Sequence, residues 1–576
     1  MAAKYDLVLR NGTLADGTGE PLREADVAIR SGAIAAVGVV RESGAEELDA
    51  RGLLVTPGFV DIHTHYDGQA TWSSRLSPSS WHGVTTAVTG NCGVGFAPCR
   101  PEDHQTLIRL MEGVEDIPGV VLAEGLPWNW ESFPEFLDAL EARRYDIDFA
   151  AQLPHAALRV YVMGQRGADR EPATPQDIAA MAELAREAVE AGALGFSTSR
   201  TLNHRSSDGK PTPTLTAAED ELLGIARALG AARKGVLQFV TDFPDPEREM
   251  AMLRRLVEES GRPLSVSLAQ AEQSPQAWRR TLRWIDDAAG AGLPMRAQVA
   301  GRPVGLMFGL DTTLNPFSTH SSWRALAARP LAEKVAALRD PELRARLLAE
   351  KPQSEAPFLR MVLQNFEKMY VLGDPPDYEQ PKERSLGAQA RARGIAPHEL
   401  ALDVMLENDG RGMLYFPFLN YADSSLDASL EMMRNANTVL GLGDGGAHLG
   451  TICDSSFTTH MLTHWARDRK RGERVPVETV VRWHTRDTAE AVGLLDRGLV
   501  RPGCKADLNV IDFERLSLRP PRMLHDLPAG GRRLVQDADG YRAAIVAGVV
   551  TYRDGAPTDA LPGRLVRGAR QAPAPA

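Results

Sequence analysis

Short apolar runs alternate with amphipathic helical stretches along most of the chain. Eight of these runs have the length and composition of buried strands, at residues 59–63, 84–90, 149–153, 194–197, 236–240, 264–268, 295–299 and 438–443. Helix starts fall between several of them. Thr174 precedes Pro175 as an N-cap before proline at N1, and Thr216 with Glu219 has the spacing of a capping box. Eight strands that alternate with helices predict an α/β fold, a TIM-like (β/α)8 barrel with its chemistry at the carboxyl ends of the strands.

Both ends of the chain have a different pattern, of short strands separated by tight turns. Candidate strands at 5–10, 26–30 and 33–37 are accompanied by the turn pairs Asn11-Gly12 and Asp16-Gly17. A similar pattern returns at 506–512 and 543–552. We expect residues 1–56 and 491–563 to form one small β-sandwich domain from the two termini, and residues 57–490 to form the barrel.

Two further segments depart from the barrel pattern. About 130 residues separate the seventh and eighth candidate strands, which is too long for an ordinary crossover. Helical stretches near 323–370 and 387–407 predict that an insertion at about 305–435 is a lid or a flank of the barrel. The last residues, 564–576, are rich in Arg, Ala and Pro and are expected to be a disordered tail.

Composition narrows the class of protein without identifying it. The 576 residues, 43% hydrophobic and 24% charged, suffice for a large core. The formal net charge of −11, without a dense basic block, argues against a nucleic-acid partner. No apolar run approaches the length of a membrane span or a signal peptide, and four cysteines are too few for a disulfide framework. A cytoplasmic protein with a small-molecule partner and no membrane partner is the expectation, and the composition leaves a homo-oligomer open.

The candidate chemistry lies where predicted strands end. His63 and His65, spaced i and i+2 at the end of the first strand, project from one face and can bind one cation, usually Zn²⁺. Cys92 follows the second strand and Asp444 follows the eighth. The first, second and eighth strands of a closed barrel are neighbours, so these four side chains can converge. Two imidazoles, a thiolate and a carboxylate make a plausible zinc shell.

A zinc ion at this point predicts hydrolytic chemistry. It would bring the pKa of its water toward about 7 and polarise a carbonyl group. Asp444 would accept the proton of that water and return it to a leaving nitrogen. Before Gly445-Gly446, the same aspartate could instead cap a turn. His448 could stabilise an oxyanion or hold substrate, or could be an ordinary polar loop residue.

The motifs around these residues resemble the amidohydrolase superfamily, and closely its N-acyl-D-amino-acid deacylase (D-aminoacylase) branch. They include Thr-Pro-Gly-Phe-Val-Asp-Ile-His-Thr-His-Tyr-Asp at 56–67, Gly-Asn-Cys-Gly at 90–93 and the closing Pro-Gly-Cys-Lys-Ala-Asp-Leu at 502–508. The Gly-Asn-Cys-Gly element is the specific part, because most amidohydrolases bridge two metals with a modified lysine. The resemblance implies a barrel with a β-sandwich, zinc, and hydrolysis of an acyl amide. His63, His65, Cys92 and Asp444 match the family's ligand and base positions.

The chain departs from the family after the fifth and sixth strands. The family has histidine ligands there, whereas segments 236–242 and 265–270 contain no histidine. Gln238, Asp242 and Gln270 are weak substitutes, so we expect one zinc ion on the side of His63 and His65 and no tightly held second one.

The family's lysine that would meet a substrate carboxylate is also absent. His448, His155 and Arg200 are the candidates for substrate binding, although an exposed arginine needs no such role. The sequence therefore predicts a zinc-dependent hydrolase that cleaves the amide bond of an N-acylated amino acid or a similar small molecule. Two alternatives stay open: a cyclic-amide hydrolase of the hydantoinase or dihydroorotase kind, and a catalytically silent barrel that binds a small molecule.

Overall fold

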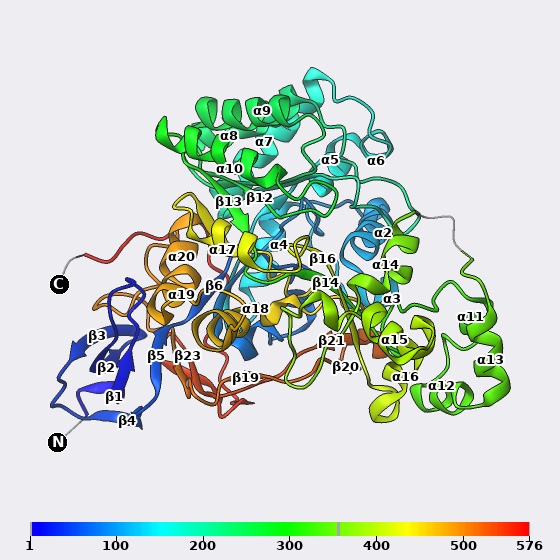
Figure 1. Ribbon diagram of the computed structural model, residues 1–576. Coiled ribbons are helices and arrows are strands. Elements are labelled where there is room, and N and C mark those ends of the chain that lie inside the picture. Colours follow the sequence, from blue (N-terminus) through cyan, green and yellow to red (C-terminus); the bar gives the residue numbers. More distant parts are fainter. Residues whose placement is uncertain (1–2, 354–356, 575–576) are drawn as a thin grey trace.

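The core of the molecule is made of two arcs of parallel strands, seen at the centre of the computed structural model, which describes residues 3–353 and 357–574 (Figure 1). Each of the eight predicted inner segments contains a strand. One arc has the order β6 (Phe59–Asp61), β7 (Val84–Thr89), β8 (Asp148–Ala151). The other runs β9 (Leu153–Pro154), β10 (Gly195–Arg200), β11 (Val236–Thr241), β12 (Leu264–Ser267), β13 (Met295–Val299), β17 (Thr438–Leu440).

The two arcs adjoin at both ends. On one side β8 leads into β9 after a single residue. On the other, Thr64 and Gly445 form an isolated parallel bridge, and the Asp444 amide donates to the His63 carbonyl oxygen over 2.9 Å. The first and eighth segments are therefore neighbours, as the strand order of a barrel requires. The α/β class is confirmed, and a regular, fully closed ring of strands stays a prediction.

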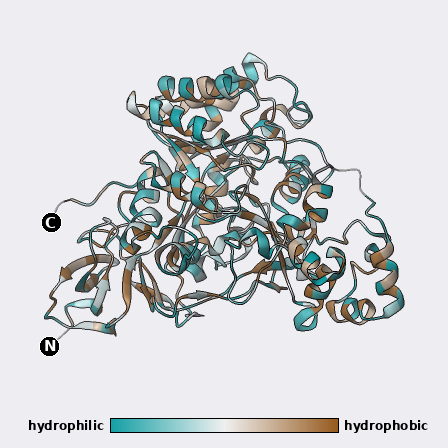
Figure 2. Ribbon diagram, viewed as in Figure 1, coloured by the Kyte–Doolittle hydropathy of each residue, from teal (hydrophilic) through white to brown (hydrophobic). Residues whose placement is uncertain are grey.

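Helices cover the outer face of the longer arc, with α7 (Pro175–Ala191), α8 (Glu219–Ala232), α9 (Pro246–Ser260) and α10 (Ala277–Gly290) at the top of Figure 1. The predicted cap of α7 is confirmed, because Thr174 and Asp177 form a reciprocal capping box. The predicted box at Thr216 is wrong: α8 begins at Glu219, after Ala218. Figure 2 shows hydrophobic colour on the inner strands and alternating hydrophilic and hydrophobic colour on the outer helices. Among the helices of the described residues, none is both long and apolar enough to cross a bilayer.

Shorter helices connect the remaining strands. They are α1 (Gln69–Trp72), α2 (His104–Glu115), α3 (Gly119–Gly125), α4 (Phe133–Glu141), α5 (His155–Met163), α6 (Gln165–Ala168), α17 (Asp427–Arg434), α18 (Phe457–His460), α19 (Val477–His484) and α20 (Arg486–Ala491). A π-helix over Met461–Asp468 continues α18. Of these, α1 is the first helix after β6, and α2 is the first α-helix after β7.

The two ends of the chain share one sheet of nine strands, at the lower left of Figure 1. Its members are β1 (Tyr5–Leu14), β2 (Arg23–Arg30), β3 (Ala33–Gly38), β4 (Gly44–Asp49), β5 (Leu54–Pro57), β18 (Leu508–Ile511), β23 (Tyr541–Val546), β24 (Val549–Arg553) and β25 (Ala556–Pro557). Antiparallel pairing of β5 with β18 joins the two halves, with Val55 opposite Val510. The termini therefore share one hydrogen-bonded sheet, and the packing of this sheet as a β-sandwich stays a prediction.

The long segment between β13 and β17 has a core of its own. Its strands β14 (Val304–Phe308), β16 (Leu414–Leu419) and β15 (Tyr370–Val371) form a small antiparallel sheet. Around it lie α11 (Ser321–Arg324), α12 (Leu331–Leu338), α13 (Pro341–Ala349), α14 (Pro357–Gln364), α15 (Leu386–Arg393) and α16 (Pro397–Gly410). Phe308, Leu338 and Ala401 are fully buried within this unit. The insertion is thus a folded flank, at the lower right of Figure 1.

The expected disordered tail is wrong for residues 564–574. The Val566 amide donates to the Phe149 carbonyl oxygen over 2.7 Å, and the Arg570 amide donates to the Gly493 carbonyl oxygen over 2.8 Å. Leu565 and Val566 are both buried. The prediction rested on the overall Arg, Ala and Pro content and did not consider these two adjacent apolar residues. Their burial holds the segment beside β8. Residues 575–576 lie outside the described residues.

Candidate metal centre

Three predicted ligands converge at the carboxyl ends of β6 and β7. The ligand atoms of His63, His65 and Cys92 all lie within 4.8 Å of one another. Nε2 of His63 is 3.3 Å from Sγ of Cys92. All three side chains are buried. Two imidazole nitrogens and a sulfur facing one point form the donor set that zinc prefers in proteins.

Asp444 and His448 reach the same point from the segment after β17. Oδ1 of Asp444 is 3.5 Å from Nε2 of His63 and 3.7 Å from Nε2 of His65. Nε2 of His448 is 4.0 Å from Oδ2 of Asp444, and its side chain is 23% exposed. The structure therefore brings together all four predicted ligands, with His448 at their more open side.

Unusual backbone conformations hold three of these side chains. Cys92, Asp444 and His448 have φ values of 55°, 46° and 53°, in the left-handed region that residues with a side chain rarely adopt. Such conformations cost free energy and persist where the surrounding structure fixes them, most often at functional sites. Two hydrogen bonds do this at Cys92 and Gly93: the Cys92 amide donates to Oε1 of Gln238 over 3.2 Å, and the Gly93 amide donates to Oγ of Ser197 over 3.0 Å.

Glycines are required where the ligand loops pass close to neighbouring strands. A Cβ on Gly90 would lie 2.2 Å from the carbonyl oxygen of Gln152, and Gly90 has a φ of 79°. A Cβ on Gly443 would lie 2.2 Å from Oδ2 of Asp61. Both contacts are closer than any real Cβ tolerates. These two glycines therefore allow Cys92 and Asp444 to approach the histidines.

His63 is oriented by an amide on the opposite side of the strand arc. Its Nδ1 lies 2.8 Å from Oε1 of Gln298 on β13, and Nε2 of Gln298 donates to Oγ of Ser265 over 2.9 Å. An amide oxygen can only accept, so Nδ1 of His63 carries the proton and Nε2 has its lone pair free. That lone pair points toward Cys92 and Asp444. Gln298 is a functional residue that the sequence did not indicate.

His65 is supported by a carboxylate that the sequence also did not indicate. Oε1 of Glu115, the last residue of α2, lies 3.4 Å from Nδ1 of His65. Oε2 of Glu115 lies 3.6 Å from Nε2 of His448. Both carboxylate oxygens and Nδ1 of His65 are buried without a hydrogen-bond partner among the described residues. A buried carboxylate beside two imidazoles requires a compensating charge, which a cation at the ligand atoms would supply.

The pKa values fit the same donor set. Burial lowers the pKa of His63 to about 4, so its imidazole is neutral at pH 7. Burial also raises the pKa of the Cys92 thiol to about 12. Burial opposes ionisation of Asp444 too, but the imidazole of His65, 3.7 Å away, together with the imidazoles of His63 and His448, holds the pKa of this carboxyl well below its usual range. Burial acts to lower the pKa of His65, but the neighbouring carboxylates of Glu115 and Asp444 hold it well above its usual value, so this ring is protonated. A bound cation would displace this proton and that of the thiol, which gives the neutral imidazole and thiolate forms that ligate. The residues present fit a zinc ion.

Gln238 on β11, Asp242 after β11 and Gln270 after β12 are the predicted substitutes for the missing histidines. Gln238 on β11 is buried, and its Nε2 has no hydrogen-bond partner among the described residues. Oδ1 of Asp242 accepts from Oγ1 of Thr201 over 2.5 Å, and Nε2 of Gln270 donates to Oδ2 of Asp423 over 2.8 Å. In the described part of the chain, His63, His65 and Cys92 are the only group of three or more potential ligands this close together. None of the three weak substitutes joins them.

His155 is held in the protein interior and does not face the barrel mouth. It is fully buried at the start of α5, with Nδ1 2.8 Å from Oγ1 of Thr198 and Nε2 2.8 Å from Oε1 of Glu221. Arg159 donates to the same Glu221 oxygen over 2.8 Å. Both ring nitrogens are therefore engaged, and the expected contact with substrate is wrong. The sequence correctly placed His155 at the end of a strand, but its ring faces Glu221 on α8.

Arg200 is likewise engaged within the protein. Its Nε donates to Oε1 of Glu249 over 2.8 Å, and its Nη1 donates to the Ala217 carbonyl oxygen over 2.5 Å. The side chain is only 18% exposed. The guanidinium is neutralised by Glu249, so the expectation that Arg200 recognises a substrate carboxylate has no support from this geometry.

His204 is near the centre although no motif marks it. It lies in the loop between β10 and α8, with Nδ1 2.8 Å from Oγ of Ser199. Burial, together with the charges of His448 and His65, lowers its pKa to about 3. The ring is therefore neutral at pH 7. A loop histidine with no periodic or motif signal can be placed at the site only by the fold.

The amidohydrolase family model matches residues 46–552, and the chain belongs to this family. The family comprises metal-dependent hydrolases of amide bonds, and the resemblance to its D-aminoacylase branch is confirmed by relatives and structures. An uncharacterised protein of Mycobacterium tuberculosis is 27% identical over 96% of this chain and 92% of its own length. The D-aminoacylase of Alcaligenes xylosoxydans xylosoxydans is 36% identical over 39% of this chain and 42% of its own length. The N-acyl-D-aspartate deacylase of the same organism is 33% identical over 44% and 47%.

Solved structures share the fold. A D-aminoacylase structure has a TM-score of 0.64 and 24% identity, covering 98% of this chain and all of the other. An N-acyl-D-glutamate deacylase from Bordetella bronchiseptica, complexed with zinc and a phosphonate mimic of the tetrahedral intermediate, also has a TM-score of 0.64, with 22% identity and the same coverage. At this level of identity the likeness shows the fold alone.

Proposed function

We propose that this chain is a hydrolase that uses one zinc ion, held by His63, His65, Cys92 and Asp444, to cleave the amide bond of an N-acylated amino acid or a similar small molecule. The observation that carries the proposal is the convergence of two imidazoles and a thiol within 4.8 Å, with a carboxylate at 3.5 Å. Zinc bound there would supply Lewis acidity, which polarises a carbonyl group and makes water more acidic.

Asp444 is the residue that moves the proton. Its carboxylate is ionised, borders the ligand atoms and also approaches His448. It can therefore accept a proton from the attacking water and deliver it to the leaving nitrogen, so that the C–N bond breaks as an amine departs. His448, partly exposed at the open side, is placed to donate a hydrogen bond to the substrate oxygen on which negative charge develops.

The surrounding residues keep this machinery in one arrangement. Gln298 fixes which nitrogen of His63 carries the proton, and Glu115 faces His65 and His448 together. His63, His65 and Cys92 are buried, whereas Asp444 and His448 are 15% and 23% exposed, so the centre is open to water on the side of these two residues. Fixed donors in a site with little water act more strongly on developing charge than the same groups in solution.

The residues of the site say less about the amine part of the substrate than about its amide bond. Arg200, the cation predicted to meet a carboxylate, is paired with Glu249. We therefore propose an acylated amine or amino-acid-like substrate in which a free carboxylate is not obligatory. A cyclic amide remains the second candidate, because a 76-residue stretch, 13% of this chain, is 48% identical to an allantoinase of Rubrobacter xylanophilus.

Metal content tests the first half of the proposal. Protein purified without chelators should hold about one zinc ion per chain by elemental analysis. Cys92→Ser should lose most of this zinc, whereas Cys99→Ser, which changes an equally buried cysteine outside the ligand group, should retain it. Metal-free wild-type protein that cannot be loaded with zinc would contradict the proposal and favour a catalytically silent barrel.

A substrate panel tests the second half. N-acyl D- and L-amino acids, simple acylated amines and cyclic imides should be compared at matched zinc occupancy. Hydrolysis of a linear acyl compound that disappears with zinc and returns when zinc is restored supports the proposal. Activity confined to the cyclic compounds would establish the second candidate instead.

A further inference from the structure

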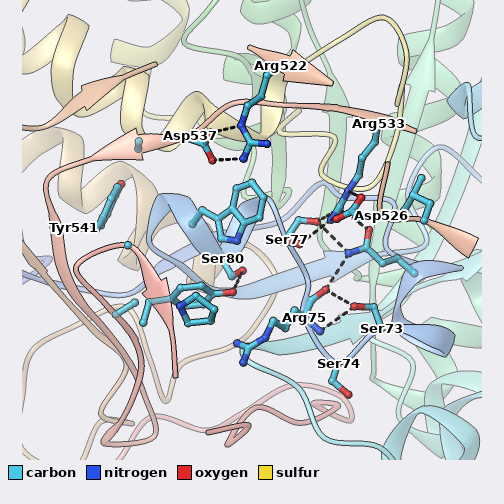
Figure 3. Close-up of a pocket in the computed structure, with 18 of the residues that line it drawn as sticks. Ser73, Ser74, Arg75, Ser77, Ser80, Arg522, Asp526, Arg533, Asp537 and Tyr541 are labelled. Atoms are coloured by element: carbon cyan, nitrogen blue, oxygen red, sulfur yellow. Dashed lines mark hydrogen bonds and ion pairs between the residues drawn. The ribbon is translucent and has the colours of Figure 1, made fainter. Parts of the chain in front are cut away.

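A cavity of about 520 Å³ lies between the segment that follows the first barrel strand and the C-terminal strands (Figure 3). One wall comes from residues 69–81, including α1, and the other from residues 522–557. The volume lies in the range of sites that hold small organic molecules, and such sites often form where two structural units meet. None of the metal-centre residues described above lines this cavity.

The charges around the cavity do not cancel. Arg522 forms two hydrogen bonds with the Asp537 carboxylate, at 2.6 and 3.0 Å, and Arg533 forms two with the Asp526 carboxylate, at 2.9 and 2.7 Å. Figure 3 shows both pairs toward the top of the view and Arg75 toward the bottom. Among the described residues Arg75 forms no ion pair within 4.0 Å. The lining therefore carries one more arginine than carboxylates, and the buried Asp146 carboxylate, which does not line the cavity, acts on Arg75 only at longer range.

The hydrogen bonds of Arg75 are also incomplete. Its Nη2 donates to the Thr558 carbonyl oxygen over 2.5 Å, but Nη1 is buried and has no partner among the described residues. The carboxylate of Asp146 is already used by the Tyr552 hydroxyl at 2.8 Å and the Leu76 amide at 2.9 Å. An unpaired, buried guanidinium N–H is costly, and an anion that reached it would recover that cost.

The remaining walls favour a flat molecule. Trp72, Trp81, Tyr541 and Tyr552 all line the cavity, and the guanidinium of Arg75 lies over the Tyr552 ring at 5.8 Å from its centroid. The Tyr552 hydroxyl contacts Oγ of Ser80 at 3.0 Å, so this ring is fixed at its far end. Aromatic walls bind planar rings well, the indole N–H groups can only donate hydrogen bonds, and the serine hydroxyls can donate as well as accept.

We propose that this cavity is a second small-molecule site, and that it binds a planar organic anion of the aryl carboxylate class, with the carboxylate at Arg75 and the ring against the aromatic walls. The inference is independent of the proposed hydrolysis, because it rests on a different cavity with different residues. Gln69, one of the lining residues, follows the predicted ligand His65 by four residues in the sequence.

The test uses 2-naphthoate and its neutral analogue 2-naphthylmethanol as probes in isothermal titration calorimetry on the full chain. Wild-type protein should bind naphthoate about tenfold more tightly than naphthylmethanol, the order expected of one partly buried ion pair. Arg75→Gln should remove this preference while leaving the affinity for naphthylmethanol nearly unchanged. Arg393→Gln, an exposed arginine that does not line the cavity, is the matched control and should keep the preference.

Two further measurements keep the result attributable to this cavity. Ser74→Trp, which places an indole at a lining position whose side chain has no necessary partner, should abolish binding of both probes while the thermal unfolding profile stays that of the wild type. Removal of zinc with a chelator should leave naphthoate binding intact. Naphthoate binding that survives Arg75→Gln unchanged, or that vanishes with the metal, would overturn the proposal, as would the absence of any binding to wild-type protein at millimolar concentration.

Discussion

Glu115 lies 3.4 Å from Nδ1 of His65, although the two residues belong to different strand–helix units of the barrel. The carboxylate is fully buried, has no other hydrogen-bond partner among the described residues, and also approaches His448. Carboxylates in this position orient a ligating imidazole and increase its basicity. Glu115 thus lies between the predicted ligand His65 and the partly exposed His448, at the buried end of α2.

Glu115→Gln should weaken zinc binding by about 10- to 100-fold, because an amide cannot supply the negative charge that supports His65. Competition with a fluorescent zinc chelator measures this change directly. Glu124→Gln, at an exposed position on α3, is the control and should bind zinc as the wild type does. Equal zinc affinity in the two variants would remove Glu115 from the support of the centre.

Asp444→Asn should lower kcat by several orders of magnitude on whichever amide the wild type hydrolyses, because an asparagine side chain cannot accept and return the proton. The comparison should be made at equal zinc content, so that lost ligation and lost proton transfer are separated. Asp403→Asn, in an exposed ion pair with Arg344, should keep full activity. Unchanged kcat in zinc-loaded Asp444→Asn would mean that another group moves the proton.

Glu379→Gln should destabilise the protein by about 3 kcal/mol at pH 7, since it breaks a buried pair in the segment that ties the insertion to the rest of the fold. Glu379 accepts hydrogen bonds from Arg469 at 2.9 and 3.0 Å and contacts His464 at 3.0 Å. Burial acts to raise the pKa of Glu379, but these hydrogen bonds lower it to about 2, below the ordinary value of 4.5.

The sign of the pH effect follows from that shift. Because the folded state holds its proton more weakly than the unfolded chain, the stabilisation by Glu379 is complete above about pH 5 and is lost as pH falls toward 2. The difference in unfolding free energy between wild type and Glu379→Gln should therefore shrink over this interval in urea titrations. Glu367→Gln, in an exposed pair with Arg391, should cost less than about 1 kcal/mol. A pH-independent difference for Glu379 would contradict the assignment.

A chain that ends at Gly563 should be less stable by about 3 kcal/mol or more, because it loses the buried Leu565 and Val566 together with the backbone bonds to Phe149. A chain that ends at Gln571 keeps these contacts and should unfold with nearly wild-type stability. Equal stability of the two truncated chains in denaturant would show that the docked tail does not contribute.

The hydrophobic pattern was sufficient to predict the strands and the ligands that directly follow them. His63, His65, Cys92 and Asp444 could be predicted because each closes an apolar run, and because a parallel arrangement places strand ends at one edge. The terminal strands could be predicted to combine because their turn-rich pattern recurs only at the two ends. Both arguments depend on local sequence signals that tertiary packing did not override.

Residues without such a signal could not be placed. Glu115, His204 and Gln298 reach the centre through a helix end, a loop and a distant strand, and only the fold brings them near. His155 ends a strand, but Glu221 on α8 turns its ring inward, a pairing between segments that no local pattern encodes. The tail was misjudged because average composition hides two adjacent apolar residues, and a short buried segment needs no more than that.

The pairing of β5 with β18 has a consequence for how the molecule is made. The ribosome releases the first five strands early, and β1 to β4 pair with one another, but β18, the partner of β5, emerges only after about 450 further residues. Until then the edge of β5 is unpaired, a surface that invites association with other nascent chains. Completion of this sheet is consequently among the last steps of folding, and a chain interrupted before residue 508 would leave the edge of β5 open to association with other chains.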